Sequence, residues 1–365
     1  MAVLFVASVV PFAIYAIIRT DLRGFDPYAF LSQSCGGFVL NGTPLLADLV
    51  TKAMPCNVLA IKGILFLLFF ASILGIACLG TLFNKEKGWL AGLFSFLSPL
   101  LFFEATKFEN DAFAIPILIW SMFFFYKARQ TKQKKYDAIA FFLVLFAGLF
   151  WHGSIYWLIA YSLSSVFFVV PAILAFLWLG VKIVAFALPN NNVVEGYFGS
   201  GIAMVAALVF GFALIPAIMW PQAALFVALL VSQIKFAWFI VPILSVGTML
   251  FYANKKLDGV SWSKTVKGIM LTASLCLVVV WGFALMGHPP YQHQWQAVDY
   301  AISQSENGFV QNDWDLGYWI YYKGGTPLAY GGGAQPAFGK GIVLTRKEID
   351  CQLLKEFKEM KVYRC

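Results

Sequence analysis

The sequence predicts a polytopic α-helical membrane protein with about eleven transmembrane helices and a small C-terminal α/β domain. Hydrophobic residues make up 61% of its 365 residues, whereas charged residues make up 12%. The mean hydropathy is +0.77. Most of the apolar residues fall in runs long enough to cross a bilayer, and short lysine-rich connections separate several of these runs. This composition excludes a soluble globular domain.

The predicted spans follow from allowing about 20 apolar residues for each crossing, with shorter spans beside loops. They are 2–18, 61–83, 89–104, 112–127, 137–152, 155–170, 171–188, 201–219, 222–234, 236–253 and 267–286. The first run has no basic segment before it and no small-residue cleavage site after it. We therefore expect it to be a transmembrane helix rather than a cleaved signal peptide.

Lysine-rich connections set the expected orientation. When the helices simply alternate, these connections share one side, which is then cytoplasmic: 84–87, 127–135 and 255–267. The opposite, external face receives the loops 19–60, 104–111 and 189–200 and the C-terminus. The same charge bias accounts for the net charge of +8, so no nucleic acid partner is expected.

The chain divides into two predicted domains at residue 286. Residues 1–286 form the transmembrane domain, which also carries the external loops. Residues 287–365 are more polar, rich in glycine, and contain alternating segments such as Gly341-Ile342-Val343-Leu344-Thr345. We expect a small external domain there, with one helix near 347–360, that depends on the membrane part for stability because it is short.

Four of the six cysteines fall in the predicted external regions. Cys35 and Cys56 share the first external loop, and we predict a disulfide between them. Cys351 and Cys365 lie in the tail, where disulfides are chemically permitted. The other two are expected to be small apolar side chains within helices: Cys78 and Cys276.

Acidic residues next to apolar runs are the candidates for chemistry. Asp26 lies in the first external loop, and Glu109 and Asp111 lie in a short turn between two predicted spans. Acids close to a bilayer are costly, so function is the default hypothesis for them. Carboxylates that converge from separate loops fit an oxygen-ligand site for Mg²⁺ or Mn²⁺.

Each of these acids also has a purely structural interpretation. Asp26 precedes Pro27 and can be a helix N-cap with proline in the first helical position. Glu109 can pair with Lys107 on a solvated loop. Glu195, in the external loop 189–200, can be an ordinary loop acid.

Four motifs in order carry a resemblance to a known family. Three lie in the membrane part: Phe25-Asp26-Pro27-Tyr28 after the first span, Phe108-Glu109-Asn110-Asp111 before the fourth, and Trp151-His152-Gly153-Ser154. In the tail, Asp313-Trp314-Asp315-Leu316-Gly317 resembles a Trp-Trp-Asp-Tyr-Gly block. Together they resemble the catalytic subunit of asparagine-linked oligosaccharyltransferase, in a short, divergent form. The resemblance implies the C-type membrane glycosyltransferase fold.

The resemblance also implies roles for the acids of the membrane part. Asp26 and Glu109 would bind the metal with Asp111 close by, and Asp26 and Asp111 would engage the acceptor amide. Glu195 would complete the site from a mobile external loop. Lys235 stands where the family has an arginine that holds the pyrophosphate of the donor.

The tail block would read the acceptor sequon through Trp314 and Asp315. Asp313 replaces the first tryptophan of the family's block and Leu316 replaces its tyrosine. Glu109 also stands where aspartate is usual. The external domain is shorter than in most of the family.

The function implied is metal-dependent transfer of an oligosaccharide from a polyprenyl-(pyro)phosphate lipid to asparagine in Asn-X-Ser/Thr sequons at the external face. The alternative is a C-type glycosyltransferase that uses a polyprenyl-monophosphate sugar and a non-sequon acceptor. A transporter ranks third, because its acids would lie at mid-helix. The expected partners are a lipid-linked oligosaccharide, an acceptor polypeptide and membrane lipid. A prokaryotic cell membrane is favoured over the endoplasmic reticulum, and a single-subunit enzyme is compatible with the sequence.

Overall fold

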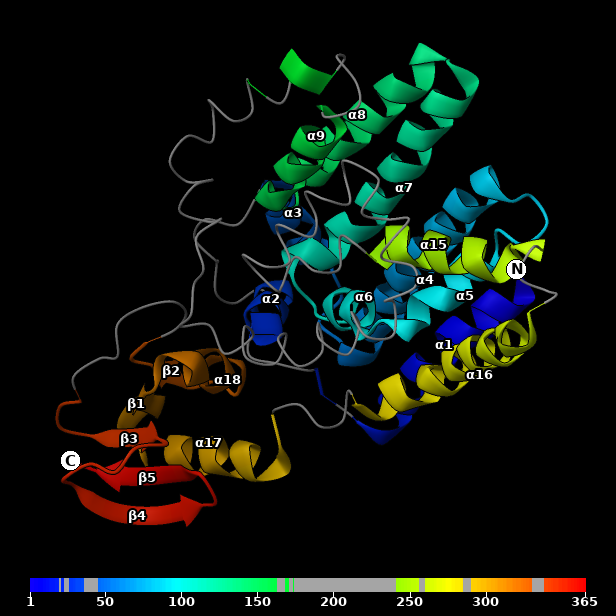
Figure 1. Cartoon of the computed structure of the whole chain (residues 1–365). Coiled ribbons are helices and arrows are strands. Elements are labelled where there is room, and N and C mark those ends of the chain that lie inside the picture. The colour runs from blue at the N-terminus through cyan, green and yellow to red at the C-terminus, as the bar shows by residue number, and fades with distance from the viewer. Residues whose placement is uncertain are drawn as a thin grey trace.

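A helical part and a C-terminal part with a five-stranded sheet make up the described structure (Figure 1). This computed structural model describes residues 1–19, 21–22, 26–35, 45–162, 168–170, 173, 241–255, 260–284, 290–329 and 338–365. The combination agrees with the predicted helical membrane protein that carries a small α/β domain. The predicted domain boundary falls within 285–289, outside the described residues.

The longer helices of the helical part are α1 (Ala2–Ile18), α4 (Val58–Phe83), α7 (Asn110–Thr131), α8 (Lys134–Gly148), α15 (Val241–Ala253) and α16 (Ser261–Ala284). A shorter helix, α9 (Ile155–Ser162), follows α8. Among the described residues, three helices are long and apolar enough to cross a membrane: Val58–Phe83, Asn110–Thr131 and Ser263–Ala284. The count of about eleven spans stays a prediction, because 201–219, 222–234 and all of 171–188 except residue 173 lie outside the described residues.

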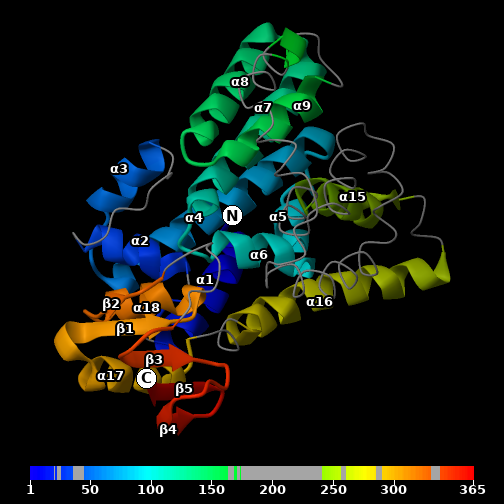
Figure 2. The same cartoon turned by 90° about the vertical axis from the view of Figure 1, so that its left-hand side faces the viewer.

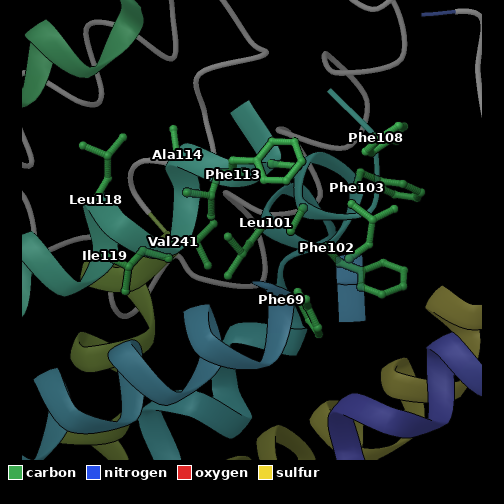
Figure 3. Close-up of a cluster of buried hydrophobic side chains, with 14 of the residues drawn as sticks. Phe69, Leu101, Phe102, Phe103, Phe108, Phe113, Ala114, Leu118, Ile119 and Val241 are labelled. Atoms are coloured by element: carbon green, nitrogen blue, oxygen red, sulfur yellow. The ribbon is translucent and has the colours of Figure 1, made fainter. Parts of the chain in front are cut away.

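Helix α4 packs against α7, and α7 packs against α8, while α1 contacts both α4 and α16. Buried phenylalanines fill the space between these helices (Figure 3). The ring of Phe69 lies 5.3 Å from that of Phe102 and 5.7 Å from that of Phe96, both edge-on. Edge-to-face contacts of this kind are the favoured aromatic geometry.

The predicted span 89–104 is not a continuous helix. It consists of α5 (Leu90–Phe94), a 3₁₀ turn (Ser95–Leu97) and α6 (Pro99–Ala105). Between the last two, Ser98 is extended, with φ −107° and ψ 126°. Pro99 causes this break, because proline donates no backbone N–H and disfavours the helical conformation in the residue before it. An apolar run alone therefore predicted the wrong element here.

The first loop contains two short helices, α2 (Asp26–Ser34) and α3 (Leu45–Ala53). The predicted disulfide between Cys35 and Cys56 is confirmed, with 4.8 Å between the two Cα atoms. The hydroxyl of Ser34 also donates to the carbonyl of Thr51 at 2.9 Å. The loop is thus closed on itself, which holds α2 close to the beginning of α4.

The C-terminal sheet has the strand order β2-β1-β3-β5-β4. Its strands are β1 (Phe309–Asn312), β2 (Thr326–Pro327), β3 (Ile342–Thr345), β4 (Gln352–Phe357) and β5 (Met360–Arg364). β1 pairs in parallel with β2 and β3, whereas β5 pairs antiparallel with β3 and β4. Helix α17 (Gln292–Gln304) packs on this sheet through Ala297, Val298 and Ala301, and α18 (Gly317–Tyr322) joins β1 to β2 (Figure 2).

The helix predicted near 347–360 is wrong, because this segment forms β4 and the turn into β5. Its lysines and glutamates favour a helix locally. Tertiary constraints override that preference: Phe357 pairs with Met360 across a tight turn in which Lys358 has φ +55°. A second disulfide, between Cys351 and Cys365, joins the outer ends of the two strands. Local propensity cannot anticipate a partner strand.

Removing the first-loop disulfide should lower the free energy of unfolding. The bond joins residues separated by 21 positions, for which loss of chain entropy in the unfolded state predicts about 3 kcal/mol. The double variant Cys35→Ser/Cys56→Ser should therefore unfold at lower temperature than the wild type in the same detergent. Cys276→Ser, which removes an exposed free thiol, is the control. Equal unfolding temperatures for all three proteins would contradict the prediction.

Candidate functional site

Two carboxylates lie at the start of α7. Glu109 is its N-cap, with the extended backbone angles φ −138° and ψ 171°, and its side chain does not cap the helix. Asp111 lies in the first turn, and both residues are half-buried. A helix N-terminus favours negative charge. Lys107, the alternative partner of Glu109, makes an ion pair with Glu104 at 3.4 Å.

Helix α2 brings Asp26 to the neighbourhood of this turn. The ring of Phe30 lies 6.1 Å from that of Phe108, which directly precedes Glu109 and is 1% exposed. Asp26 begins α2, about 6 Å along the helix axis from Phe30. The two acidic segments therefore meet through buried aromatic contacts, although the side chain of Asp26 is outside the described set.

The C-terminal domain packs against the same helix. The buried ring of Tyr28 lies 5.2 Å from Trp295 in α17 and 5.0 Å from Tyr322 in α18. Burial raises the pKa of Tyr28 well above its usual value, so its hydroxyl stays protonated. That hydroxyl accepts a hydrogen bond from the backbone N–H of Leu22 at 3.0 Å. Helix α2 thus contacts both the acidic turn and the domain that carries the tail block.

The tail block follows β1 directly. Asp313 is buried, and its carboxylate accepts hydrogen bonds from the hydroxyl of Thr345 and the backbone N–H of Arg346, both at 2.9 Å. Asp315 makes an ion pair with the guanidinium of Arg346 at 2.7 Å. Burial raises the pKa of Asp315, and Arg346 acts in the opposite direction. Trp314 begins a 3₁₀ turn, and its side chain is outside the described set.

Both carboxylates of the block are therefore held at the end of β3. Arg346 was not singled out from the sequence, because nothing in a single sequence pairs it with a residue that precedes it by 31 positions. The expectation that Asp313 and Asp315 contact an acceptor stays a prediction. Glu195 and Lys235 lie outside the described residues.

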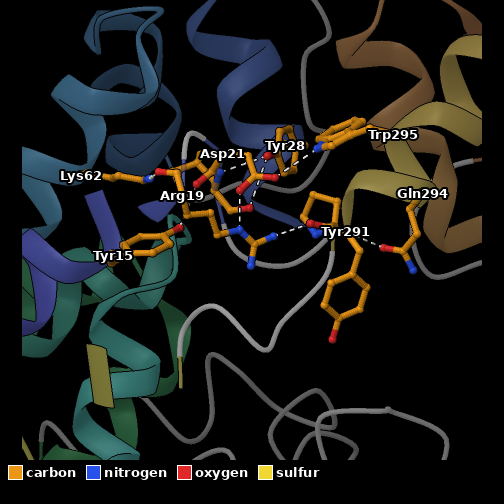
Figure 4. Close-up of polar contacts among 10 residues, drawn as sticks. Tyr15, Arg19, Asp21, Tyr28, Lys62, Tyr291, Gln294 and Trp295 are labelled. Atoms are coloured by element: carbon orange, nitrogen blue, oxygen red, sulfur yellow. Dashed lines mark hydrogen bonds and ion pairs between the residues drawn. The ribbon is translucent and has the colours of Figure 1, made fainter. Parts of the chain in front are cut away.

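Sequence reasoning also missed a buried polar cluster at the end of α1 (Figure 4). The carboxylate of Asp21 bonds to the guanidinium of Arg19 and accepts a hydrogen bond from the indole N–H of Trp295 at 3.1 Å. Lys62, which is 3% exposed, donates to the carbonyl of Arg19 at 2.6 Å. Lys62 carried a signal, because it is the one charged residue in the apolar run 58–83.

The chemical type of the described carboxylates fits a hard divalent cation. Glu109 and Asp111 supply oxygen ligands of the type that Mg²⁺ and Mn²⁺ prefer. Among the described residues, no group of three or more His, Cys, Asp or Glu side chains gathers as a metal site. The predicted further ligand is Asp26, which lies in the helix that contacts this turn through Phe30.

Comparison with known proteins reveals the fold. No protein family model and no curated protein sequence matches the chain. A crystal structure of the Archaeoglobus fulgidus oligosaccharyltransferase in complex with zinc and sulfate matches with a TM-score of 0.56 and 14% identity, covering 90% of this chain and 62% of that one. The apo form of that protein matches with a TM-score of 0.55 and 12% identity, covering 90% and 64%.

The chain thus shares the fold of this archaeal enzyme while spanning less than two thirds of its length. The likeness extends over the helical part and the C-terminal domain together, because it covers 90% of the present chain. At this identity the comparison establishes the fold alone.

Replacing Asp313 should destabilise the C-terminal domain. Asp313→Ala leaves the Thr345 hydroxyl and the Arg346 N–H without this acceptor, which should cost about 1–3 kcal/mol of unfolding free energy. Urea titration of the full chain in detergent, followed by proteolysis of the C-terminal domain, measures the change. Glu348→Ala, at a side chain that is 87% exposed, should change stability by less than about 0.5 kcal/mol. Unchanged stability of Asp313→Ala would mean that these bonds contribute nothing net.

Proposed function

We propose that this chain is a membrane glycosyltransferase that transfers an oligosaccharide from a polyprenyl-(pyro)phosphate lipid to asparagine in Asn-X-Ser/Thr sequons. One observation carries the proposal: α2, which begins with Asp26, packs on the Glu109 turn through Phe30 and on the C-terminal domain through Tyr28. Helix α2 therefore contacts both the acidic turn and the C-terminal domain, which also carries the Trp-Asp block. The fold shared with an archaeal oligosaccharyltransferase supports the same conclusion.

The acceptor amide is a poor nucleophile because its nitrogen lone pair is delocalised into the carbonyl. In the proposed reaction, Asp26 and Asp111 accept hydrogen bonds from the two amide N–H groups. These bonds weaken the conjugation and orient the nitrogen towards the anomeric carbon of the sugar. The C–O bond to the pyrophosphate breaks as the N–C bond forms, and the amide nitrogen passes one proton to one of these two carboxylates.

The leaving group is a lipid pyrophosphate that gains negative charge. Asp26 and Glu109, with Asp111 close by, would hold Mn²⁺ or Mg²⁺, which when bound stabilises this charge. Lys235 would contribute a positive point charge, without the bidentate fork of an arginine. Glu195 would complete the site from the loop 189–200.

Acceptor choice is assigned to the Trp-Asp block. Trp314 and Asp315, with Asp313 beside them, would receive the hydroxyl two residues after the acceptor asparagine. The ion pair between Asp315 and Arg346 would hold the Asp315 carboxylate in position for this contact. We place the reaction at the external face of a prokaryotic cell membrane, with the C-terminus external.

A specific observation favours the second candidate, a glycosyltransferase that uses a polyprenyl-monophosphate sugar and a non-sequon acceptor. Asp313 and Asp315 are bonded within the C-terminal domain, to Thr345 and Arg346. These bonds give the two aspartates a structural role that requires no sequon-containing acceptor. A transporter fits less well, because Glu109 and Asp111 lie at a helix end rather than at mid-helix.

The decisive experiment uses the purified full chain, a lipid-linked oligosaccharide extract, Mn²⁺ and a fluorescent Asn-X-Thr peptide. Transfer would shift the peptide to lower mobility in a gel. No shift with the peptide, together with sugar transfer from a polyprenyl-monophosphate donor to another acceptor, would favour the second candidate.

Removing a proposed metal ligand should abolish most activity without unfolding the protein. Asp26→Ala and Glu109→Ala should each lower the transfer rate by at least about a hundredfold, because charge stabilisation in the transition state is lost. EDTA should do the same, with recovery when Mn²⁺ is added. Glu86→Ala, in an exposed connection, is the control variant and should be fully active. Full activity of the wild type in chelator would remove the metal from the mechanism.

The acceptor pocket should discriminate among peptides. Asn-X-Thr should outcompete Asn-X-Ser, since its extra methyl group contributes up to about 0.8 kcal/mol when buried. Asn-X-Ala should be poorer by about 1–3 kcal/mol, because a buried polar group would lose its partner. Trp314→Ala should raise the acceptor KM more than it lowers kcat, because the block lies apart from the metal site. Equal use of the Thr and Ala peptides would mean that the block is structural.

A further inference from the structure

A buried polar cluster joins the membrane part to the C-terminal domain (Figure 4). The carboxylate of Asp21 bonds through one oxygen to the guanidinium of Arg19 and through the other to the indole N–H of Trp295. Arg19 also donates to the carbonyl of Pro290, just before α17. We call Arg19, Asp21 and Trp295 the clamp, because they hold the end of α1 and the beginning of α17 together.

The clamp is supported from the membrane side. Lys62 of α4 donates to the carbonyl of Arg19 at 2.6 Å, and its ammonium lies 4.0 Å from the centre of the Tyr15 ring. The hydroxyl of Tyr15 donates to the carbonyl of Asp21 at 3.1 Å. Arg19 is 9% exposed and Lys62 is 3% exposed. Burying two cations near one carboxylate lowers the stability of the folded protein. Such groups can still serve to hold neighbouring elements in a defined geometry.

The residue that follows Asp21 is hydrogen-bonded to α2. Leu22 follows Asp21, and its N–H donates to the hydroxyl of Tyr28 at 3.0 Å, while that hydroxyl donates back to the Leu22 carbonyl at 3.3 Å. Tyr28 lies two residues after Asp26 in the same helix. Asp21 and Leu22, before Asp26 in the chain, and Tyr28, after it, are therefore held by hydrogen bonds.

We infer that Asp21 is a positioning residue: through its bonds to Arg19 and Trp295 it holds the start of α2, and with it Asp26, in a fixed place between the acidic turn and the C-terminal domain. This inference rests on the proposed function. Trp295 belongs to the domain that carries the Trp-Asp block and packs 5.6 Å from Trp319, ring to ring. The clamp would thus fix the position of Asp26 relative to the domain that carries the proposed acceptor-binding block.

Two substitutions test the clamp without creating a large cavity. Asp21→Asn keeps the shape of the side chain but removes the charge that Arg19 binds. Trp295→Phe keeps an aromatic ring against Tyr28 but removes the indole N–H that donates a hydrogen bond to Asp21. Glu348→Gln is the matched control, because Glu348 is an ion-paired carboxylate of the same domain whose partner is Lys361, away from α2.

The first measurement is steady-state transfer to the fluorescent peptide. Both clamp variants should lower kcat by about tenfold or more, since displacement of a reacting group by about 1 Å can cost a hundredfold in rate. The acceptor KM should stay within about twofold, because the acceptor-binding block is unchanged. Glu348→Gln should match the wild type in both constants.

The second measurement is hydrogen exchange of the backbone amides of residues 28–35. Exchange there should be faster in both clamp variants and unchanged in Glu348→Gln, while the amides of α7 keep their wild-type protection. A positioning role predicts this local change together with a lower kcat for each folded molecule, whether or not the unfolding temperature also falls. A merely structural role predicts a lower unfolding temperature and fewer active molecules, with wild-type kcat for each active molecule.

The inference is overturned if both variants retain wild-type kcat, or if α2 exchanges at the wild-type rate in both. Failure of the proposed function has a different signature, because the wild type itself would then transfer nothing to the peptide. In that event the exchange measurement still decides whether the clamp holds α2.

Discussion

The bond between the carboxylate of Asp21 and the indole of Trp295 is the contact on which the arrangement of the candidate site depends. It joins two segments that are 274 residues apart, at the point where the first helix ends and the C-terminal domain begins. Charged groups in such a buried place are costly unless each is bonded. Here Arg19 bonds to the partly buried carboxylate of Asp21 and to the buried carbonyl of Pro290, and Lys62 bonds to the carbonyl of Arg19, so these bonds offset part of the cost.

Aromatic packing extends this junction in both directions. Tyr28 connects α2 to Trp295 and Tyr322, and Phe30 connects the same helix to Phe108 beside the acidic turn. Rings of this size bury much surface with few rotatable bonds, so they hold neighbouring elements at defined distances. One short helix, α2, consequently connects the turn before α7 to the C-terminal domain, which also carries the Trp-Asp block.

The C-terminal domain obtains its own rigidity from different contacts. Asp313 binds the end of β3, Asp315 binds Arg346, and a disulfide joins β4 to β5. The segment predicted as a helix became β4 because β5 offered it backbone partners, which outweighs a helix propensity of a few tenths of a kcal/mol per residue. The 3₁₀ turn at Trp314 follows the inner strand β1 of this sheet.

The sequence by itself determined the membrane class, most helices of the described part, the first-loop disulfide and the acids at the start of α7, because apolar runs, cysteine positions and isolated charges are local signals. Three other features differ from the prediction or lie outside it: Pro99 divides an apolar run into two short helices, β4 replaces a helix, and Asp21 meets Trp295. The first is still a local effect, because proline disfavours a helical conformation in Ser98. The other two depend on partners far away in the chain, and a single sequence contains no information about which distant groups will satisfy a buried charge or a strand edge.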